Sequence, residues 1–295
     1  MNDLSTNIRL KKLIQRIMPQ SIIEKIRQSF PYQLYLRSVG DWRYPIFSLR
    51  WKIAGLLNSP RKVSVDGIEL TIPCENWITH FRWYLFKTKE TEVRKYLKDV
   101  MQADDILFDI GANIGVFSVY AAKIHPKSTI FSFEPEYSNL NLLKNNVLAN
   151  KVNEQVNIFS VGISDEVCIS KLHLSSTESG AAVHTESKNN ISTTDEGYKV
   201  VWNEGIMTTT LDEFCRDQQI IPNCIKIDTD GNELKILKGA TSTLKNPKLK
   251  NLIIEMPLHN EEQLFECETI LKNFGFIPTW SEREETKNEV WTKNI

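Results

Sequence analysis

Short apolar runs alternate with helical patterns after residue 105, and this alternation constrains the fold more than any other feature of the chain. The apolar runs have the length of buried strands: Ile106–Ile110, Thr129–Phe133, Val156–Val161, Cys224–Ile227 and Asn251–Met256. Helical patterns fill the intervals near residues 115–124, 137–149, 232–245 and 260–273. Strands and helices that alternate at this spacing predict an α/β fold, in which a parallel sheet has helices on both faces.

Further strands are expected on either side of this core. Residues 63–72 alternate apolar and polar side chains around Asp66-Gly67, which is a strong signal for a two-residue hairpin. The tail offers two more strands, Phe276–Trp280 and Glu289–Trp291, joined by a charged turn. We therefore expect a hairpin and entry helix over residues 63–100 and the α/β core over residues 101–295.

The first 62 residues differ from the rest in charge. They hold 12 Lys/Arg and 3 Asp/Glu, whereas the remaining residues hold 24 and 34, so the net charge of −1 conceals two opposite balances. Helical patterns over residues 6–30 and mixed aromatic and basic residues over 30–57 predict a helical appendage. Such mixing suits an anionic partner or the periphery of a membrane. The alternative is that the aromatic side chains pack on the main domain and the cations are solvated.

Composition narrows the class of protein. With 41% hydrophobic and 25% charged residues and only 12 Gly and 11 Pro among 295, the chain is neither collagen-like nor wholly disordered. Five scattered cysteines without a CxxC pair fit a reducing compartment. We see no secretory signal and no apolar run of the ~18 residues that a membrane span needs. The expected location is the cytoplasm, where the protein could also contact the inner face of the membrane.

The sharpest motif is the run from Ile106 to Ser118. A buried strand ends at Asp109, a turn with Gly111 and Gly115 follows, and a helix then begins whose first N–H groups are free to bind a ligand. Nineteen residues after Gly115, Glu134 ends the next strand, where a carboxylate can accept both hydroxyls of a ribose. Together these features predict an adenosine-type ligand across the strand ends.

The turn also indicates which ligand this is. Dinucleotide sites prefer G-x-G-x-x-G, and here Asn113 stands where the middle glycine makes room for a pyrophosphate. The acidic Asp109 instead suits a ligand with an ammonium and a sulfonium, and S-adenosylmethionine has both. Two alternatives stay open: a Rossmann-like NAD- or nucleotide-sugar-dependent enzyme, and a non-catalytic scaffold that retains the fold.

Several blocks of the sequence resemble the signature blocks of FkbM-type methyltransferases. They are Asp109–Gly115, Phe133–Pro135, Thr209–Asp212, Ile225–Glu233, Leu237–Ala240 and Ile253–Glu255. The resemblance covers roughly residues 63–295. It implies a class I methyltransferase fold: a three-layer α/β/α sandwich whose mostly parallel seven-stranded sheet has an antiparallel last strand. It also implies S-adenosylmethionine-dependent methyl transfer, usually to a hydroxyl of a sugar or other secondary metabolite.

The resemblance and the strand ends together nominate the site residues. The expected cofactor-binding residues are Asp109, Gly111, Ala112, Asn113, Gly115, Phe117, Ser118, Glu134, Pro135, Val161 and Gly162. The expected catalytic residues are Asp228, Asp230 and Glu233, which follow the fourth parallel strand. The family block more often reads Asp-Val-Glu-Gly-Ala-Glu where this chain has Asp228–Glu233, so the acceptor preference can differ.

A neutral alcohol is a poor nucleophile, so a base or a metal must help to remove its proton. Asp228 can accept this proton, hold the donor's amino group or orient the acceptor, and His184 and His259 are further candidate bases. A divalent metal on Asp228, Asp230 and Glu255 is possible, but it is not predicted. The expected partner is a small-molecule or glycan acceptor rather than a nucleic acid, and the oligomeric state stays open.

Overall fold

The computed structural model describes Ile53 and residues 60–294, apart from residues 74, 89, 196, 259 and 282–287. The chain divides into two compact units, Met1–Ser59 and Pro60–Ile295, and the description here concerns the second. The helices predicted within residues 6–30, and the surface-binding role predicted for residues 1–62, therefore fall almost wholly outside the described residues. That part of the domain prediction stays a prediction.

The unit begins with the expected hairpin. Strands β1 (Arg61–Val65) and β2 (Ile68–Ile72) pair antiparallel, and Val65 lies opposite Ile68. Asp66 and Gly67 form the turn with φ of 50° and 83°, the left-handed values that a tight hairpin turn of this twist requires. The predicted hairpin is confirmed, with its first strand starting two residues earlier than expected.

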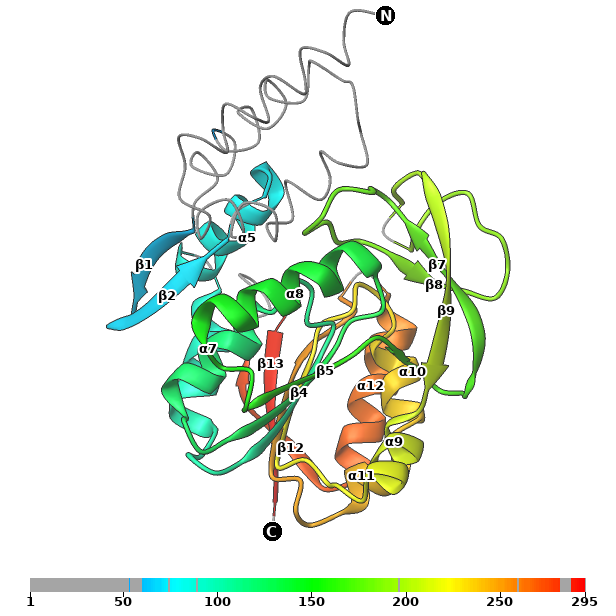
Figure 1. The fold of residues 1–295 in the computed structure, drawn as a ribbon. Coiled ribbons are helices and arrows are strands. Elements are labelled where there is room, and N and C mark those ends of the chain that lie inside the picture. Colours follow the sequence, from blue (N-terminus) through cyan, green and yellow to red (C-terminus); the bar gives the residue numbers. More distant parts are fainter. Residues whose placement is uncertain are drawn as a thin grey trace, which may run out of the picture. The chain divides into compact units, whose positions relative to one another are not determined.

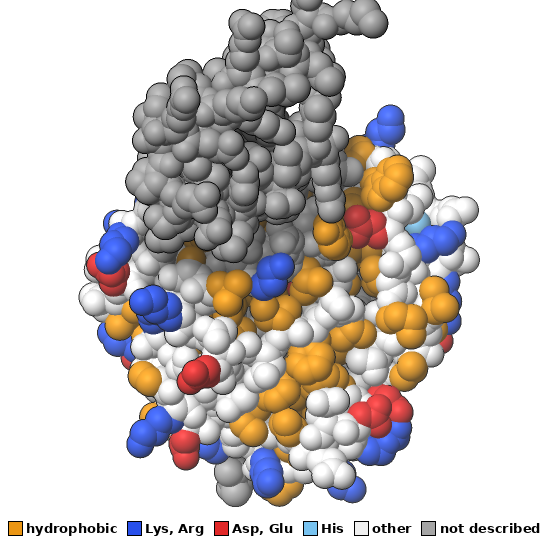
Figure 2. Space-filling model, in the orientation of Figure 1, with side chains coloured by type: hydrophobic (Ala, Val, Ile, Leu, Met, Phe, Trp, Pro, Cys, Tyr) orange, Lys and Arg blue, Asp and Glu red, His pale blue; other side chains and the backbone are white. Residues whose placement is uncertain are grey.

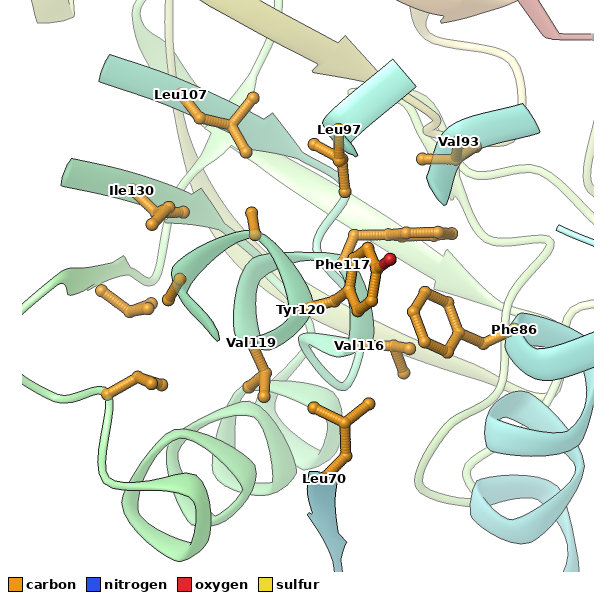
Figure 3. Packing of buried hydrophobic residues seen from close by; sticks show 14 of the residues in the cluster. Leu70, Phe86, Val93, Leu97, Leu107, Val116, Phe117, Val119, Tyr120 and Ile130 are labelled. Atoms are coloured by element: carbon orange, nitrogen blue, oxygen red, sulfur yellow. The ribbon is translucent and has the colours of Figure 1, made fainter. Parts of the chain in front are cut away.

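Three short helical elements lead from the hairpin into the sheet. They are α5 (Trp77–Thr88), α6 (Thr91–Lys95) and the π-helical turn η1 (Tyr96–Val100). Phe86 of α5 joins them to the core, because its ring packs edge-on against Phe117 at 5.5 Å and Tyr120 at 5.2 Å between ring centres (Figure 3). This packing anchors α5 beside the carboxyl edge of the sheet, where the candidate site lies.

The centre of the unit is a seven-stranded sheet with the order β12-β13-β11-β10-β3-β4-β5 (Figure 1). Its strands are β3 (Ile106–Ile110), β4 (Thr129–Phe133), β5 (Val156–Phe159), β10 (Cys224–Ile227), β11 (Asn251–Glu255), β12 (Phe276–Ser281) and β13 (Asn288–Lys293). The first five run parallel, and β13 runs antiparallel to both of its neighbours. The predicted class I fold is confirmed, although β5 and β11 end slightly before the predicted residues.

Helices cover both faces of this sheet (Figure 1). Helices α7 (Val116–Ile124) and α8 (Tyr137–Asn150) lie on one face, and α9 (Leu211–Gln218), α10 (Glu233–Lys238), α11 (Thr241–Lys245) and α12 (Glu261–Asn273) lie on the other. Successive residues of a strand point to opposite faces, so Leu107 belongs to one apolar cluster and Phe108 to the other. The result is the three-layer α/β/α sandwich.

A second sheet of four strands was not expected. It has the order β6-β9-β7-β8 and consists of β6 (Gly162–Ile163), β7 (Cys168–Leu174), β8 (Thr185–Glu186) and β9 (Trp202–Thr209). Two of these strands have only two residues, too few for any periodic pattern, and the long pair β7–β9 is joined by a polar segment that reads as a loop. This sheet supplies one wall of the candidate site.

The helices after the second sheet also differ from expectation. The single helix expected over residues 232–245 is two helices that separate at Gly239, where a Cβ would lie 2.3 Å from the carbonyl oxygen of Ser164. Helix α9 was missed, although Thr210 and Glu213 have the spacing of a capping box. The Thr210 hydroxyl indeed accepts the N–H of Glu213 at 3.0 Å.

On the face drawn in Figure 2, side chains of both charges are interspersed with apolar ones, so the acidic excess of this unit is not gathered there. The four cysteines that the structure describes, Cys168, Cys215, Cys224 and Cys267, form no disulfide. Within the described part of the chain, none of the helices is both long enough and apolar enough to cross a membrane.

Candidate active site

A cavity that is partly open to solvent lies at the carboxyl ends of β3, β4 and β10. This is where open α/β sheets place their ligands. The lining residues expected from the sequence are Gly111, Asn113, Glu134, Pro135, Val161, Gly162, His184, Asp228 and Asp230. Leu172 and Ile206 of the second sheet add an apolar wall, and α5 adds Arg82. Eight of the fourteen predicted catalytic and cofactor-binding residues, together with the candidate base His184, therefore come together around one space.

The turn after β3 is built on residues with left-handed backbone. Gly111, Asn113 and Gly115 have φ of 73°, 49° and 79°. A Cβ on Gly111 would lie 1.9 Å from the carbonyl oxygen of Asp228, and one on Gly115 would lie 2.0 Å from Leu143. Gly111 is therefore required by its packing against the backbone of Asp228, and it also lines the cavity. Gly115 packs against the side chain of Leu143 and is absent from the cavity lining.

Replacement of Gly111 by alanine is expected to cost about 2–5 kcal/mol of unfolding free energy. A side chain in the left-handed region costs about 1–2 kcal/mol, and overpacking against a fixed backbone adds about 1–3 kcal/mol. Gly275→Ala is the matched control, because Gly275 has φ of 80° and nothing within 4 Å of its added Cβ. Urea unfolding measures both. Equal losses in the two variants would contradict the packing role of Gly111.

Glu134 is a buried carboxylate held by two backbone donors. The N–H of Asn113 donates to its Oε2 at 2.7 Å, and the N–H of Glu136 donates to its Oε1 at 3.0 Å. Burial raises the pKa of Glu134 to about 7, although these two hydrogen bonds lower it. The group therefore lines the cavity in a fixed orientation and changes its charge near neutral pH.

Asp109 does not reach the cavity, although the sequence predicts that it binds the cofactor. It is fully buried, with Oδ1 3.1 Å from Nζ of Lys226 and Oδ2 accepting the Ser118 hydroxyl at 2.5 Å. The Ser118 hydroxyl also lies 2.7 Å from that of Ser132. Asp109 and Ser118 thus form an internal network behind the cavity wall, which corrects their predicted role.

Three other predicted cofactor contacts are also absent from the cavity lining, namely Ala112, Gly115 and Phe117. Gly115 begins α7, while Phe117 lies among the core aromatic rings, with Nζ of Lys226 5.1 Å from its ring centre. Their places in the motif reflect the packing of the turn and of α7. Only the outer residues of the turn, Gly111 and Asn113, face the ligand space.

Lys226 is a functional residue that the sequence reading missed. It is buried in β10 between Asp109 and Asp228, whose carboxylate oxygen lies 3.7 Å from Nζ, and it also donates to the carbonyl oxygen of Gly111 at 3.1 Å. Burial lowers the pKa of Lys226, but the two carboxylates outweigh this and raise it. A lysine within the otherwise apolar strand Cys224–Ile227 was the signal that could have revealed it.

A cluster of carboxylates follows β10 and β11. Ligand oxygens of Asp228, Asp230 and Glu255 lie within 4.8 Å of one another, the three residues that the sequence named as a possible metal set. Burial and the neighbouring Asp228, with which it shares a hydrogen bond, raise the pKa of Glu255 well above its usual range. A proton therefore satisfies part of this cluster, and a divalent cation could take its place.

Glu233 does not share this cavity. It is buried at the start of α10, where it accepts the N–H groups of Thr229 at 2.9 Å and of Gly231 at 3.0 Å. These bonds shape the turn between β10 and α10. The structure therefore corrects the prediction that Glu233 is catalytic. Asp228 is the most available acid of this group, with 38% of its side chain exposed and facing the cavity.

The segment over residues 175–201 closes the cavity from above. The carbonyl oxygen of Ala181 accepts the side-chain amides of Asn113 at 2.8 Å and Asn139 at 3.2 Å. The N–H of Val183 donates to Asp230 at 2.6 Å. Val183 has φ of 64°, which is rare for a β-branched residue and typical of strained functional segments. This segment therefore covers part of the cavity.

His184 belongs to this cover and lines the cavity. Burial lowers its pKa to about 4, so the imidazole is neutral at neutral pH. Its Nδ1 accepts the N–H of Ser175 at 3.3 Å, which leaves the proton on Nε2. A ring with this arrangement donates a hydrogen bond and does not accept a proton, so it is a poor general base. His259 lies outside the described residues.

Comparisons with known proteins agree with this geometry. The sequence pattern of the Methyltransferase FkbM domain matches residues 109–282. The hexuronic acid methyltransferase AglP of Haloferax volcanii is 27% identical over 193 residues, which are 65% of this chain and 73% of that protein. The 31-O-demethyl-FK506 methyltransferase FkbM of Streptomyces tacrolimicus is 32% identical over 72 residues, which are 24% and 27% of the two chains.

Among solved structures, the methyltransferase FkbM of Methylobacillus flagellatus KT matches with a TM-score of 0.48 and 14% identity. The match covers 73% of this chain and 52% of that one, so this chain spans about half of its length.

The sheet order, the glycine turn after β3 and the acids at the ends of β4 and β10 define a class I methyltransferase. The family match covers more than half of the sequence. The chain belongs to the FkbM methyltransferase family, and the family implies S-adenosylmethionine as the methyl donor.

Proposed function

We propose that this methyltransferase transfers the methyl group of S-adenosylmethionine to a hydroxyl oxygen of a sugar, in a glycan or in a secondary metabolite. One observation carries the proposal: Glu134 and Asp228 face the same cavity from β4 and β10, the two strands that flank β3. We assign Glu134 to the donor and Asp228 to the acceptor. The printed activity of AglP, on a hexuronic acid, supports a sugar as the acceptor.

The donor's place follows from the chemistry of the lining residues. The Glu134 carboxylate can accept both hydroxyls of a ribose, and it is fixed by its two backbone donors. The apolar residues Val161, Leu172 and Ile206 suit an adenine ring. The acidic lining of the cavity as a whole suits a donor that carries a sulfonium and an ammonium. The contribution of Leu172 and Ile206 to this wall was not expected, because both residues belong to the second sheet, which the sequence did not predict.

S-adenosylmethionine supplies an electrophilic methyl group whose bond to sulfur breaks as the bond to the acceptor oxygen forms, the sulfur keeping the electron pair. The protein has to align the acceptor oxygen with this bond and to remove the hydroxyl proton. Asp228 is the group that we assign to the proton, because its carboxylate reaches the cavity while Asp230 is engaged by the N–H of Val183. Asp228 is positioned by an ion pair with Lys226 and a hydrogen bond with Glu255.

Titration calorimetry with S-adenosylhomocysteine over pH tests the donor site. The ribose hydroxyls donate to ionised Glu134, whose pKa is about 7, so protonation must compete with binding. We expect the dissociation constant to rise about tenfold from pH 8 to pH 6, because the ionised fraction of a group with this pKa falls about tenfold.

Glu134→Gln is the control for this titration, because Glu90 and Asp230 have pKa values of about 7 and about 6 and titrate in the same range. The variant should bind more weakly at pH 8 and lose most of the pH dependence. Absence of binding to the unmodified protein at 1 mM ligand would refute the proposed function. An unchanged pH profile in Glu134→Gln would refute the assignment of Glu134 to the ribose.

A further inference from the structure

Arg82 is a cation of the cavity for which the donor site has no evident use. It belongs to α5, it is half-buried, and it lines the cavity. Its Nε donates to the carbonyl oxygen of Gly180 at 2.9 Å, which ties the guanidinium to the covering segment. Among the described residues, no carboxylate lies within ion-pair distance of it, so its terminal N–H groups are available to a ligand.

The charge of the cavity makes this cation significant. Acids line it at Glu134, Glu186, Asp195, Asp228 and Asp230, whereas Arg82 is the one Lys or Arg among the described lining residues. Such a wall attracts a cationic donor and repels an anionic acceptor. Arg82 is therefore the described lining residue whose charge can favour an anionic acceptor. A planar guanidinium held at one nitrogen presents two parallel donors in the geometry that a carboxylate accepts.

The covering segment connects Arg82 to Asp230. The Nε of Arg82 donates to the carbonyl oxygen of Gly180, and the N–H of Val183, three residues further along, donates to Asp230. The charge of Arg82 also lowers the pKa of Asp230. Moreover, Arg82 comes from a helix ahead of residues 109–282, to which the family match is confined. The residues assigned to the donor all lie inside that match.

We propose that Arg82 is a specificity residue that binds the carboxylate of an acidic sugar acceptor, such as a hexuronic acid. This rests on the proposed function, because it assigns the acceptor side of the same cavity. The α-carboxylate of S-adenosylmethionine has the same chemistry as a uronate carboxylate. The experiment therefore needs separate arms for the donor and for the acceptor.

The donor arm compares two ligands on the full-length chain by calorimetry. S-adenosylhomocysteine carries the α-carboxylate, and 5′-methylthioadenosine lacks the whole amino acid part. For Arg82→Gln we expect the affinities of both ligands to stay within about threefold of the unmodified protein. A selective loss of S-adenosylhomocysteine binding would assign Arg82 to the donor and overturn the proposal.

The acceptor arm uses 4-nitrophenyl β-D-glucuronide and 4-nitrophenyl β-D-glucoside as probes, with S-adenosylhomocysteine saturating. These probes differ in the carboxylate, which replaces the hydroxymethyl group of the glucoside. The unmodified protein should bind the glucuronide about 10- to 100-fold more tightly, as expected for a charge-assisted pair of hydrogen bonds. Arg82→Gln should abolish this preference, and Arg82→Lys should retain part of it, because lysine keeps the charge without the paired donors.

Lys87→Gln is the matched control, because Lys87 is an exposed cation of the same helix. Lys87→Gln should leave the affinities for the donor analogues and for the two glycosides unchanged. Thermal unfolding shows whether each variant is folded. Equal binding of the two glycosides by the unmodified protein, or an intact preference in Arg82→Gln, would overturn the proposal. Loss of S-adenosylhomocysteine binding by the unmodified protein would instead refute the proposed function, so the two failures are distinguishable.

Discussion

Replacement of Asp228 by asparagine is expected to lower kcat for methyl transfer about 10²- to 10⁴-fold, the usual contribution of a positioned general base. Asparagine keeps the shape of the side chain and can still hydrogen-bond to the acceptor, but it cannot take the hydroxyl proton. Asp228 lies at the carboxyl end of β10, and its backbone carbonyl packs against Gly111. The substitution should therefore leave the fold and the position of the donor unchanged.

The measurement is single-turnover formation of S-adenosylhomocysteine, with ligand affinities determined in parallel. Asp195→Asn is the matched control, because Asp195 also lines the cavity but belongs to the covering segment. It should lower the rate by less than about threefold. If Asp228→Asn weakened the binding of S-adenosylhomocysteine much more than the binding of 5′-methylthioadenosine, Asp228 would hold the donor's amino group. That result would contradict its assignment as the base.

Replacement of Lys226 by methionine is expected to cost about 3–5 kcal/mol of unfolding free energy, as for other buried ion pairs that lose one partner. The side chains of Lys226 and Asp109 are 3% and 0% exposed, and their charged atoms are 3.1 Å apart. Methionine fills a similar volume but leaves the Asp109 carboxylate without a counter-charge. The remaining donor to Asp109, the Ser118 hydroxyl, is neutral.

Urea unfolding at neutral pH measures this loss, and Lys144→Met provides the reference because Lys144 is exposed on α8. The double variant Lys226→Met with Asp109→Asn removes both charges. It should recover a large part of the loss, because a neutral pair needs no counter-charge. A loss below about 1 kcal/mol in Lys226→Met would contradict the central place of this ion pair in the structure.

Much of the fold could be predicted from sequence because its central strands are nearly uniform apolar runs that alternate with helical patterns. The runs at β3, β4 and β10 are apolar at every position except a few, and the boundaries predicted for these strands agree with the structure. The hairpin turn at Asp66 and Gly67 was equally clear, because only left-handed backbone closes such a turn. In each case the local chemistry and the final structure favour the same conformation.

The second sheet could not be predicted, for a physical reason. Strand β6 pairs with β9 more than forty residues away, and β8 has two residues, so neither has a local pattern that distinguishes it from a loop. Their conformation depends on tertiary contacts with β7 and β9. The wall that they form was therefore missing from the expected site.

The site itself was predicted in outline and corrected in detail. Sequence reading placed Glu134 and Asp228 at strand ends, and the parallel topology brings them to one cavity. It also treated Asp109 and Glu233 as ligand contacts, because a motif shows which residues cluster but not which of them face inward. Arg82 was missed because α5 reaches the cavity through tertiary packing, and no spacing within the sequence relates it to the β3 turn.

Residues 180–183 of the cover are attached to the rest of the site through their main chain. The contacts made by Gly180, Ala181 and Val183 to Arg82, Asn113, Asn139 and Asp230 all use N–H or carbonyl groups of the covering segment. The partly exposed side chain at position 182, which lines the cavity, can therefore be exchanged while these hydrogen bonds are kept. The receiving side chains, in contrast, have little freedom to vary. Such an arrangement allows the acceptor specificity to change through substitutions in the covering segment while the residues that bind the donor stay the same.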